Sequence, residues 1–61
     1  MKYYIIYLLH GRVVDISSWD YGEEENRDSQ YEMDAAQVED GRTVTTYGFV
    51  FNEVQKLDQV R

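Results

Sequence analysis

"KYYIIYLLHGRVVDISSW", residues 2 to 19, predicts a β-hairpin at the start of the chain. Residues 2 to 9 are rich in Tyr and Ile, which favour strands. Gly11 then supplies the backbone freedom that a tight hairpin turn requires. Residues 12 to 19 are expected to return as the second strand, so the chain begins with two antiparallel strands.

The turn also predicts which side chains share a face. Either two-residue loop, His10-Gly11 or Gly11-Arg12, pairs odd positions of the first strand with even positions of the second. The expected core face carries Tyr3, Ile5, Tyr7, Leu9, Val14 and Ile16, and the opposite face carries Tyr4, Ile6, Leu8, Val13, Asp15 and Ser17. The second face is more apolar than a solvated face should be, so either another element of this chain or another chain is expected to cover it. Tyr4, Ile6 and Leu8 are therefore candidates for self-association in a homodimer.

The middle of the chain is expected to hold a loop followed by a short helix. Residues 23 to 28, "EEENRD", show no apolar period and are interpreted as loop. Ser29 and Glu32 match a capping box, and Tyr31, Ala35 and Val38 have helical spacing, which favours a helix over residues 30 to 38. Alternating apolar positions leave a strand over the same residues as the alternative.

The last third predicts a strand over residues 42 to 51, "RTVTTYGFVF", with Gly48 at a bulge or a close backbone approach. Tyr47, Phe49 and Phe51 are expected on one face, and Val44 and Val50 on the other. Asn52 matches a helix cap, which favours a short terminal helix; an edge strand over residues 53 to 60 is the alternative. The whole chain, residues 1 to 61, is expected to be a single α+β domain, a small antiparallel sheet of three or four strands with one or two short helices.

Size and composition exclude several classes of protein. A chain of 61 residues buries only about 60% of its unfolded surface, so its stability margin is thin. There is no Cys, which excludes disulfides and thiolate chemistry. The apolar run from Tyr3 to Leu9 is too short for a membrane span and lacks a signal-peptide cleavage site. These features predict a soluble protein of the cytoplasm.

The sequence offers little for catalysis, and no enzyme activity is expected. The only histidine, His10, lies at the predicted turn, and neither a nucleophile motif nor a phosphate-binding loop occurs. The calcium-loop pattern is absent as well, since Asp20, Gly22 and Glu25 are too close together for it. We expect no cofactor and no functional metal site.

The negative charge is concentrated between residues 20 and 40. This segment contains nine acidic residues and one basic residue, Arg27, so its net charge is −8. The rest of the chain carries +2, which gives −6 for the whole chain. Such a surface disfavours direct binding to nucleic acid or to an anionic membrane. Two interpretations remain open: a solvated surface that keeps the protein soluble, or an array of carboxylates that binds a basic groove in place of phosphates.

The second interpretation is favoured by the aromatic residues next to the acidic ones, because aromatic residues are enriched as anchors in protein interfaces. The candidate partner-binding residues are Trp19, Asp20, Tyr21, Glu23, Glu24, Glu25, Asp28, Tyr31, Glu32 and Asp34.

In size, acidity, hairpin start and lack of catalytic residues, the chain resembles the small phage-encoded inhibitors of host proteins, including anti-CRISPR and other DNA-mimic proteins. That resemblance implies a non-enzymatic inhibitor acting in the bacterial host cytoplasm. Its partner would be a basic host protein, a nucleic-acid-binding enzyme or a defence complex, whose site it occludes. The competing hypothesis is a self-associating β-sheet module with no inhibitory role.

Overall fold

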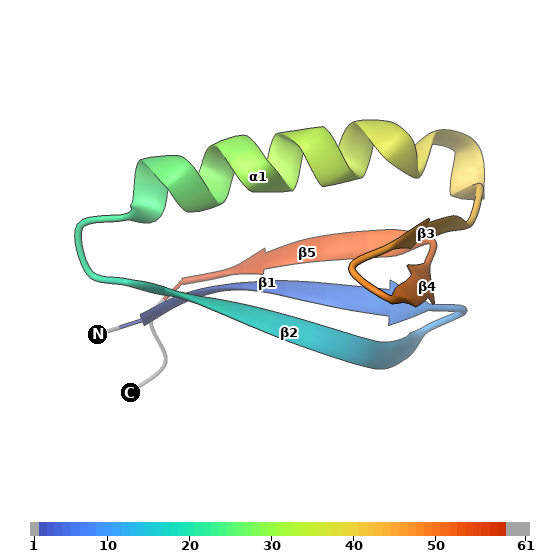
Figure 1. Cartoon of the computed structure of the whole chain (residues 1–61), viewed down its shortest axis with the longest axis horizontal. Helices are drawn as coiled ribbons and strands as arrows, with labels where there is room; N and C mark the ends of the chain where they lie inside the picture. The colour runs from blue at the N-terminus through green and yellow to red at the C-terminus, as the bar shows by residue number, and fades with distance from the viewer. Residues whose placement is uncertain (1, 59–61) are drawn as a thin grey trace.

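The computed structural model describes residues 2–58, which form two antiparallel sheets, one α-helix and a 3₁₀ turn (Figure 1). The elements are β1 (Lys2–Leu9), β2 (Arg12–Asp20), α1 (Glu24–Gln37), the 3₁₀ turn (Glu39–Gly41), β3 (Val44–Thr46), β4 (Phe49–Phe51) and β5 (Glu53–Leu57). The expected α+β class and N-terminal hairpin are confirmed. The sheet that contains this hairpin has three strands, within the expected three or four, and residues 42 to 51 add a separate two-stranded sheet among residues 2–58.

The main sheet has the order β2-β1-β5, so the N-terminal strand is its centre. Leu9 pairs with Arg12, which makes His10-Gly11 the two-residue loop. Both loop residues have positive φ, 50° and 84°, the backbone geometry of a type I′ turn, whose twist matches that of the flanking strands. The turn predicted from Gly11 is therefore confirmed, and its position is resolved.

A β-bulge next to this turn changes which residues of β2 face the core. Leu8 pairs with Val13 but Tyr7 pairs with Asp15, so Val14 is an extra residue with no partner in β1. Beyond the bulge, odd-numbered residues of β1 pair with odd-numbered residues of β2. The expectation that Val14 and Ile16 lie on the core face was wrong, and their side chains are 39% and 54% exposed.

Ser17 and Trp19 take the places expected for Val14 and Ile16. Ile5 pairs with Ser17, and Tyr3 pairs with Trp19, so these side chains share the face covered by α1. The opposite, outer face of the sheet carries Tyr4, Ile6, Leu8, Val13, Ile16 and Leu57.

Helix α1 is longer than the sequence pattern indicated and begins six residues earlier. The acidic residues Glu24 and Glu25 occupy its first turn, where the partial positive charge of a helix N-terminus favours carboxylates. Ser29 consequently lies inside the helix, and the expected capping box at Ser29 was wrong. The alternative of a strand over residues 30 to 38 is excluded by α1 itself.

The predicted strand over residues 42 to 51 is a second hairpin, β3 and β4, which turns at Tyr47-Gly48. Both residues have positive φ, 59° and 85°, so Gly48 belongs to a turn and not to a bulge. Val44 pairs with Phe51 and shares its face, contrary to the expectation that it would lie opposite. Residues 53 to 57 form β5, so the expected terminal helix was wrong and its alternative, an edge strand, was right as far as Leu57. Residues 59 and 60 of that alternative lie outside the described residues.

The core lies between α1 and the sheet, at the end where the second hairpin packs against β1. Its buried members are Ile5, Tyr7, Val38, Phe51 and Val54, with Trp19, Tyr31, Ala35, Val44 and Phe49 packed around them. The ring of Tyr7 meets those of Phe49 and Phe51 edge to face, with centroids 5.2 and 4.9 Å apart. This arrangement is the favoured geometry for aromatic pairs, and it ties the second hairpin to the central strand.

Candidate functional site

Helix α1 carries most of the expected binding residues, but it does not present them equally. Glu25 and Glu32 are exposed, whereas Glu23, Glu24 and Asp28 are half-buried. Asp20 is exposed and pairs with Lys2 at the end of the first hairpin. Asp34 is 0% exposed. Its inclusion among the partner-binding residues was therefore wrong, because a partner has no access to it.

Arg27, the only base between residues 20 and 40, points inward from α1 and is 4% exposed. Its guanidinium donates to the main-chain oxygens of Tyr4 and Leu57, at 3.3 and 3.0 Å, and to the carboxylates of Asp28 and Asp58, each at 2.8 Å. Burial lowers the pKa of Arg27, but the hydrogen bonds that Arg27 donates to Asp58 and Asp28 outweigh that effect and raise the pKa overall. The hydrogen bonds of Arg27 thus connect the first half of α1 to the start of β1 and to the end of β5.

Two of the clustered glutamates also have structural roles at the start of α1. Glu23 Oε1 accepts from the main-chain nitrogen of Asp20 at 3.3 Å, and Glu24 Oε1 accepts from that of Gly22 at 2.8 Å. These bonds order the turn that leads from β2 into the helix. The run "EEE" therefore has a local explanation for Glu23 and Glu24, which leaves Glu25 and Glu32 as the helix acids without a bond to another described residue.

The expected aromatic anchors separate into one exposed and two half-buried residues. Tyr21 is 70% exposed, in the turn before α1. Tyr31 is half-buried against the core, and Lys56 Nζ lies 5.1 Å from the centre of its ring. Trp19 is half-buried on β2, and its Nε1 donates to Ser17 Oγ at 3.3 Å. Tyr21 adjoins the exposed acids of the helix start, whereas Trp19 faces the inside of the molecule.

The self-association candidates are less accessible than expected. Leu8 is 8% exposed, and Tyr4 and Ile6 are half-buried between the flanking strands. Leu8 is therefore unavailable to a second chain. The exposed apolar surface of the outer face lies instead on Val13 and Ile16 of β2 and on Leu57 of β5, which are 57%, 54% and 40% exposed.

A buried polar cluster centred on Asp34 joins three elements. Tyr7 OH of β1 donates to Asp34 Oδ2 at 2.7 Å, and Tyr47 OH of the second hairpin donates to Oδ1 at 3.2 Å. Gln30 Nε2, one helical turn before Asp34, donates to the same Oδ1 at 3.1 Å and to Tyr47 OH at 2.6 Å. The buried carboxylate is thereby satisfied by three donors, as a buried charge requires.

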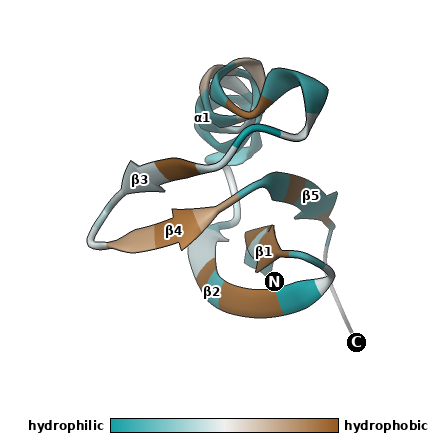
Figure 2. Cartoon of the chain, turned by 90° about the vertical axis from the view of Figure 1, so that its right-hand side faces the viewer, coloured by the Kyte–Doolittle hydropathy of each residue, from teal (hydrophilic) through white to brown (hydrophobic). Residues whose placement is uncertain are grey.

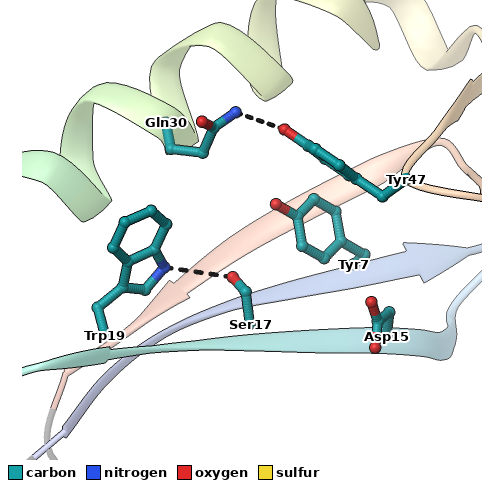
Figure 3. Close-up of a pocket in the computed structure, with 6 residues that line it drawn as sticks. All are labelled: Tyr7, Asp15, Ser17, Trp19, Gln30 and Tyr47. Carbon is teal, nitrogen blue, oxygen red and sulfur yellow. Dashed lines mark hydrogen bonds between the residues drawn. The ribbon is translucent and has the colours of Figure 1, made fainter.

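Beside this cluster the surface forms a hollow of about 190 Å³ (Figure 3). It is lined by Tyr7, Asp15, Ser17, Trp19, Gln30 and Tyr47. Figure 3 shows the indole of Trp19 on one side, the two tyrosine rings on the other, and Gln30 of α1 above. The hollow is thus assembled from β1, β2, α1 and the turn of the second hairpin.

No protein-family model, curated protein or solved structure matches this chain.

Of the residues that line the hollow, sequence reasoning singled out only Trp19 as a binding residue. Ser17 and Asp15 were predicted to lie on the opposite face. The bulge at Val14 exchanges the two faces of β2 for the residues that follow it, and no sequence pattern marks the bulge. Gln30 lies within the predicted helix, but nothing in the sequence distinguishes it as a binding residue. Tyr47 was missed because it lies in a turn that was assigned as strand. The dipeptide Tyr47-Gly48, with Gly in a two-residue loop, is the signal that was available for the turn.

A metal-ligand cluster and a membrane-spanning helix are both absent from residues 2–58. No group of three or more carboxylate or imidazole side chains in this part of the chain is arranged to hold a metal ion. No helix in the same range has the length and apolar character that crossing a membrane requires.

Proposed function

We propose that this chain is a non-enzymatic inhibitor that binds a basic, nucleic-acid-binding protein of a bacterial host and occludes its site. The contact surface would be the outward side of α1 together with the turn before it, here called the acidic surface. It comprises Asp20, Tyr21, Glu23, Glu24, Glu25, Asp28 and Glu32.

The observation that carries this proposal is the inward position of Arg27. Because its guanidinium is buried among main-chain oxygens, the one positive charge of residues 20 to 40 does not interrupt the outward side of the helix. The positive charges beside this surface are those of Lys2, which pairs with Asp20, and of Lys56, whose Nζ lies 3.6 Å from Asp28 Oδ1. A predominantly negative surface raises the rate of encounter with an oppositely charged partner and disfavours wrong ones. Solubility alone is served equally well by interspersed charges.

The spacing of the acids supports a basic groove as the partner's surface. Glu25, Asp28 and Glu32 stand three and four residues apart on α1, so the Cβ atoms that carry successive acidic side chains are roughly 5 to 6 Å apart. That spacing is comparable with one or two steps of about 3.4 Å between charges along a nucleic-acid strand. A groove that neutralises phosphates would accept these carboxylates, and the bound protein would exclude DNA or RNA.

The test is affinity capture from bacterial lysate with three baits. One is the parent chain, one carries Glu25→Gln with Glu32→Gln, and a control carries Glu39→Gln with Glu53→Gln. All four glutamates are exposed, and each double variant removes two charges. We expect a nucleic-acid-binding protein that the parent and control retain and the first variant loses, and whose retention falls as salt rises. Equal retention by all three baits, or retention that is unchanged by salt, would contradict the proposal.

A second candidate function is self-association through the outer sheet face. Val13, Ile16 and Leu57 are exposed there, and Figure 2 shows hydrophobic segments of β2 on the side of the molecule opposite α1. Light scattering over a range of concentrations distinguishes this candidate. If it holds, the parent is a dimer, Ile16→Lys makes it monomeric, and Val50→Lys, at an exposed valine of β4, leaves it dimeric. A monomeric parent excludes it.

A further inference from the structure

The hollow beside the Asp34 cluster has rigid aromatic walls. Tyr7 and Tyr47 each direct a hydroxyl to Asp34, and their ring centres are 5.9 Å apart. Trp19, on the other side, is held through its indole nitrogen by Ser17 (Figure 3). The polar hydrogens of all three rings are engaged within the protein. Because Tyr7 is buried, the rings that offer a ligand their π systems are those of Trp19 and Tyr47.

The turn at Tyr47 and the hydrogen bonds of its hydroxyl together fix the position of this ring. Its φ of 59° lies in the left-handed region, which the first position of this two-residue turn requires and which a residue with a side chain rarely adopts. The bonds from Tyr47 OH to Asp34 and from Gln30 to Tyr47 OH hold the ring over the hollow.

The electrostatic character of the hollow is negative. Asp15 stands at its rim, exposed, and forms no ion pair with any residue between 2 and 58. Asp34 lies behind the two tyrosine hydroxyls. Gln30 uses its amide nitrogen as the donor to Asp34 and Tyr47, and Figure 3 shows its carbonyl oxygen on the side away from Tyr47. No basic side chain is among the lining residues.

We propose that this hollow binds one basic side chain, Arg or Lys, of the partner protein, with the cation against the rings of Trp19 and Tyr47 and beside the carboxylate of Asp15. Aromatic walls with a nearby carboxylate are the chemistry that recognises organic cations. The volume of about 190 Å³ is below the roughly 300 Å³ at which pockets for drug-sized ligands begin, so it suits the end of a side chain and not a nucleotide. The identity of the donor as a partner protein rests on the proposed function, but the pocket is testable without that protein.

The test is an NMR titration of the full chain with two capped tripeptides, Gly-Arg-Gly and Gly-citrulline-Gly. Citrulline has the shape of arginine without its charge. The indole N–H of Trp19 is a specific reporter, because the chain has a single tryptophan. We expect the arginine peptide to shift this signal saturably, and the citrulline peptide to bind at least fivefold more weakly.

Two variants assign the effect to the hollow. Asp15→Asn should weaken binding of the arginine peptide about two- to fivefold, as for loss of an exposed ion pair. Glu53→Gln removes the same charge from an exposed position outside both the hollow and the acidic surface, and should leave the affinity unchanged. Equal binding of the two peptides, no saturable shift at Trp19, or equal affinities of the two variants would overturn the proposal.

Failure of the pocket and failure of the proposed function are distinguishable. If the arginine peptide does not bind but the lysate capture still depends on Glu25 and Glu32, the acidic surface acts without the hollow. If the peptide binds and the capture shows no such dependence, the hollow recognises a basic side chain of a protein that does not use the acidic surface.

Discussion

Asp34 receives hydrogen bonds from β1, from the second hairpin and from its own helix. Tyr7 OH, Tyr47 OH and Gln30 Nε2 all donate to its carboxylate, which is completely buried. Removing the carboxylate leaves the buried Tyr7 hydroxyl without its acceptor, and an unsatisfied buried group costs about 1 to 3 kcal/mol in addition to the lost bonds.

Replacement of this residue is therefore predicted to be costly. Asp34→Ala should lower the free energy of unfolding by about 3 kcal/mol, a large part of what a domain of this size possesses. Urea denaturation followed by the fluorescence of Trp19 measures the change. The control Glu32→Ala, at an exposed position two residues away, should change stability by less than about 0.5 kcal/mol. Equal effects of the two substitutions would show that the cluster does not stabilise the fold.

The same cluster predicts a loss of stability at alkaline pH. Burial, followed by the bond to Asp34, raises the pKa of Tyr7 far above its ordinary value of 10.0. Burial and the Asp34 charge raise that of Tyr47 as well. In the unfolded chain both tyrosines ionise near pH 10, so the stability that they contribute is complete below that pH and is lost as the pH rises toward their folded values.

We expect the free energy of unfolding to fall above about pH 10, by about 1.4 kcal/mol per pH unit from the buried Tyr7, and by less from Tyr47, whose exposed side chain is screened by solvent. Urea titrations between pH 8 and 11 measure the slope. Tyr7→Phe should reduce it. A slope that is the same in Tyr7→Phe and in the parent would contradict the assignment.

At the scale of elements, α1 illustrates how much the sequence could predict. Its inward positions Arg27, Tyr31, Asp34 and Val38 have regular helical spacing, but two of the four are charged, so a search for apolar periodicity found only the second half. The first hairpin turn was predictable because Gly11 is needed for it. The β-bulge at Val14 was not predictable, since no residue type or spacing in β2 marks the position of the unpaired residue. For the same reason the sequence indicated the acidic surface, through its charge, but not the hollow, which depends on the facing of β2.

The packing of α1 against the sheet is predicted to depend on the planar guanidinium group of Arg27. Arg27→Lys keeps the charge but provides one ammonium in place of a guanidinium that reaches four acceptors. We expect a loss of about 1 to 2 kcal/mol in the free energy of unfolding. The same exchange at the exposed Arg42 should have no measurable effect, and it serves as the matched control. If both variants unfold at the parent's urea midpoint, Arg27 does not fasten the helix.

At the scale of the whole molecule, the two long sides of the fold have opposite character. The side of α1 carries the acidic surface, and the outer sheet face carries exposed apolar residues on β2 and β5. The hollow opens between β2, α1 and the second hairpin. This distribution supports a protein that acts by contact, with charge directing the encounter.

Competition with nucleic acid tests occlusion most directly. The protein captured by the parent bait would be purified, bound to a fluorescently labelled oligonucleotide, and titrated with the parent or the Glu25→Gln, Glu32→Gln variant while the anisotropy is followed. We predict that the parent displaces the oligonucleotide completely and competitively, and that the variant needs at least tenfold more protein. Binding of the parent without release of the oligonucleotide, or equal displacement by the variant, would contradict the account.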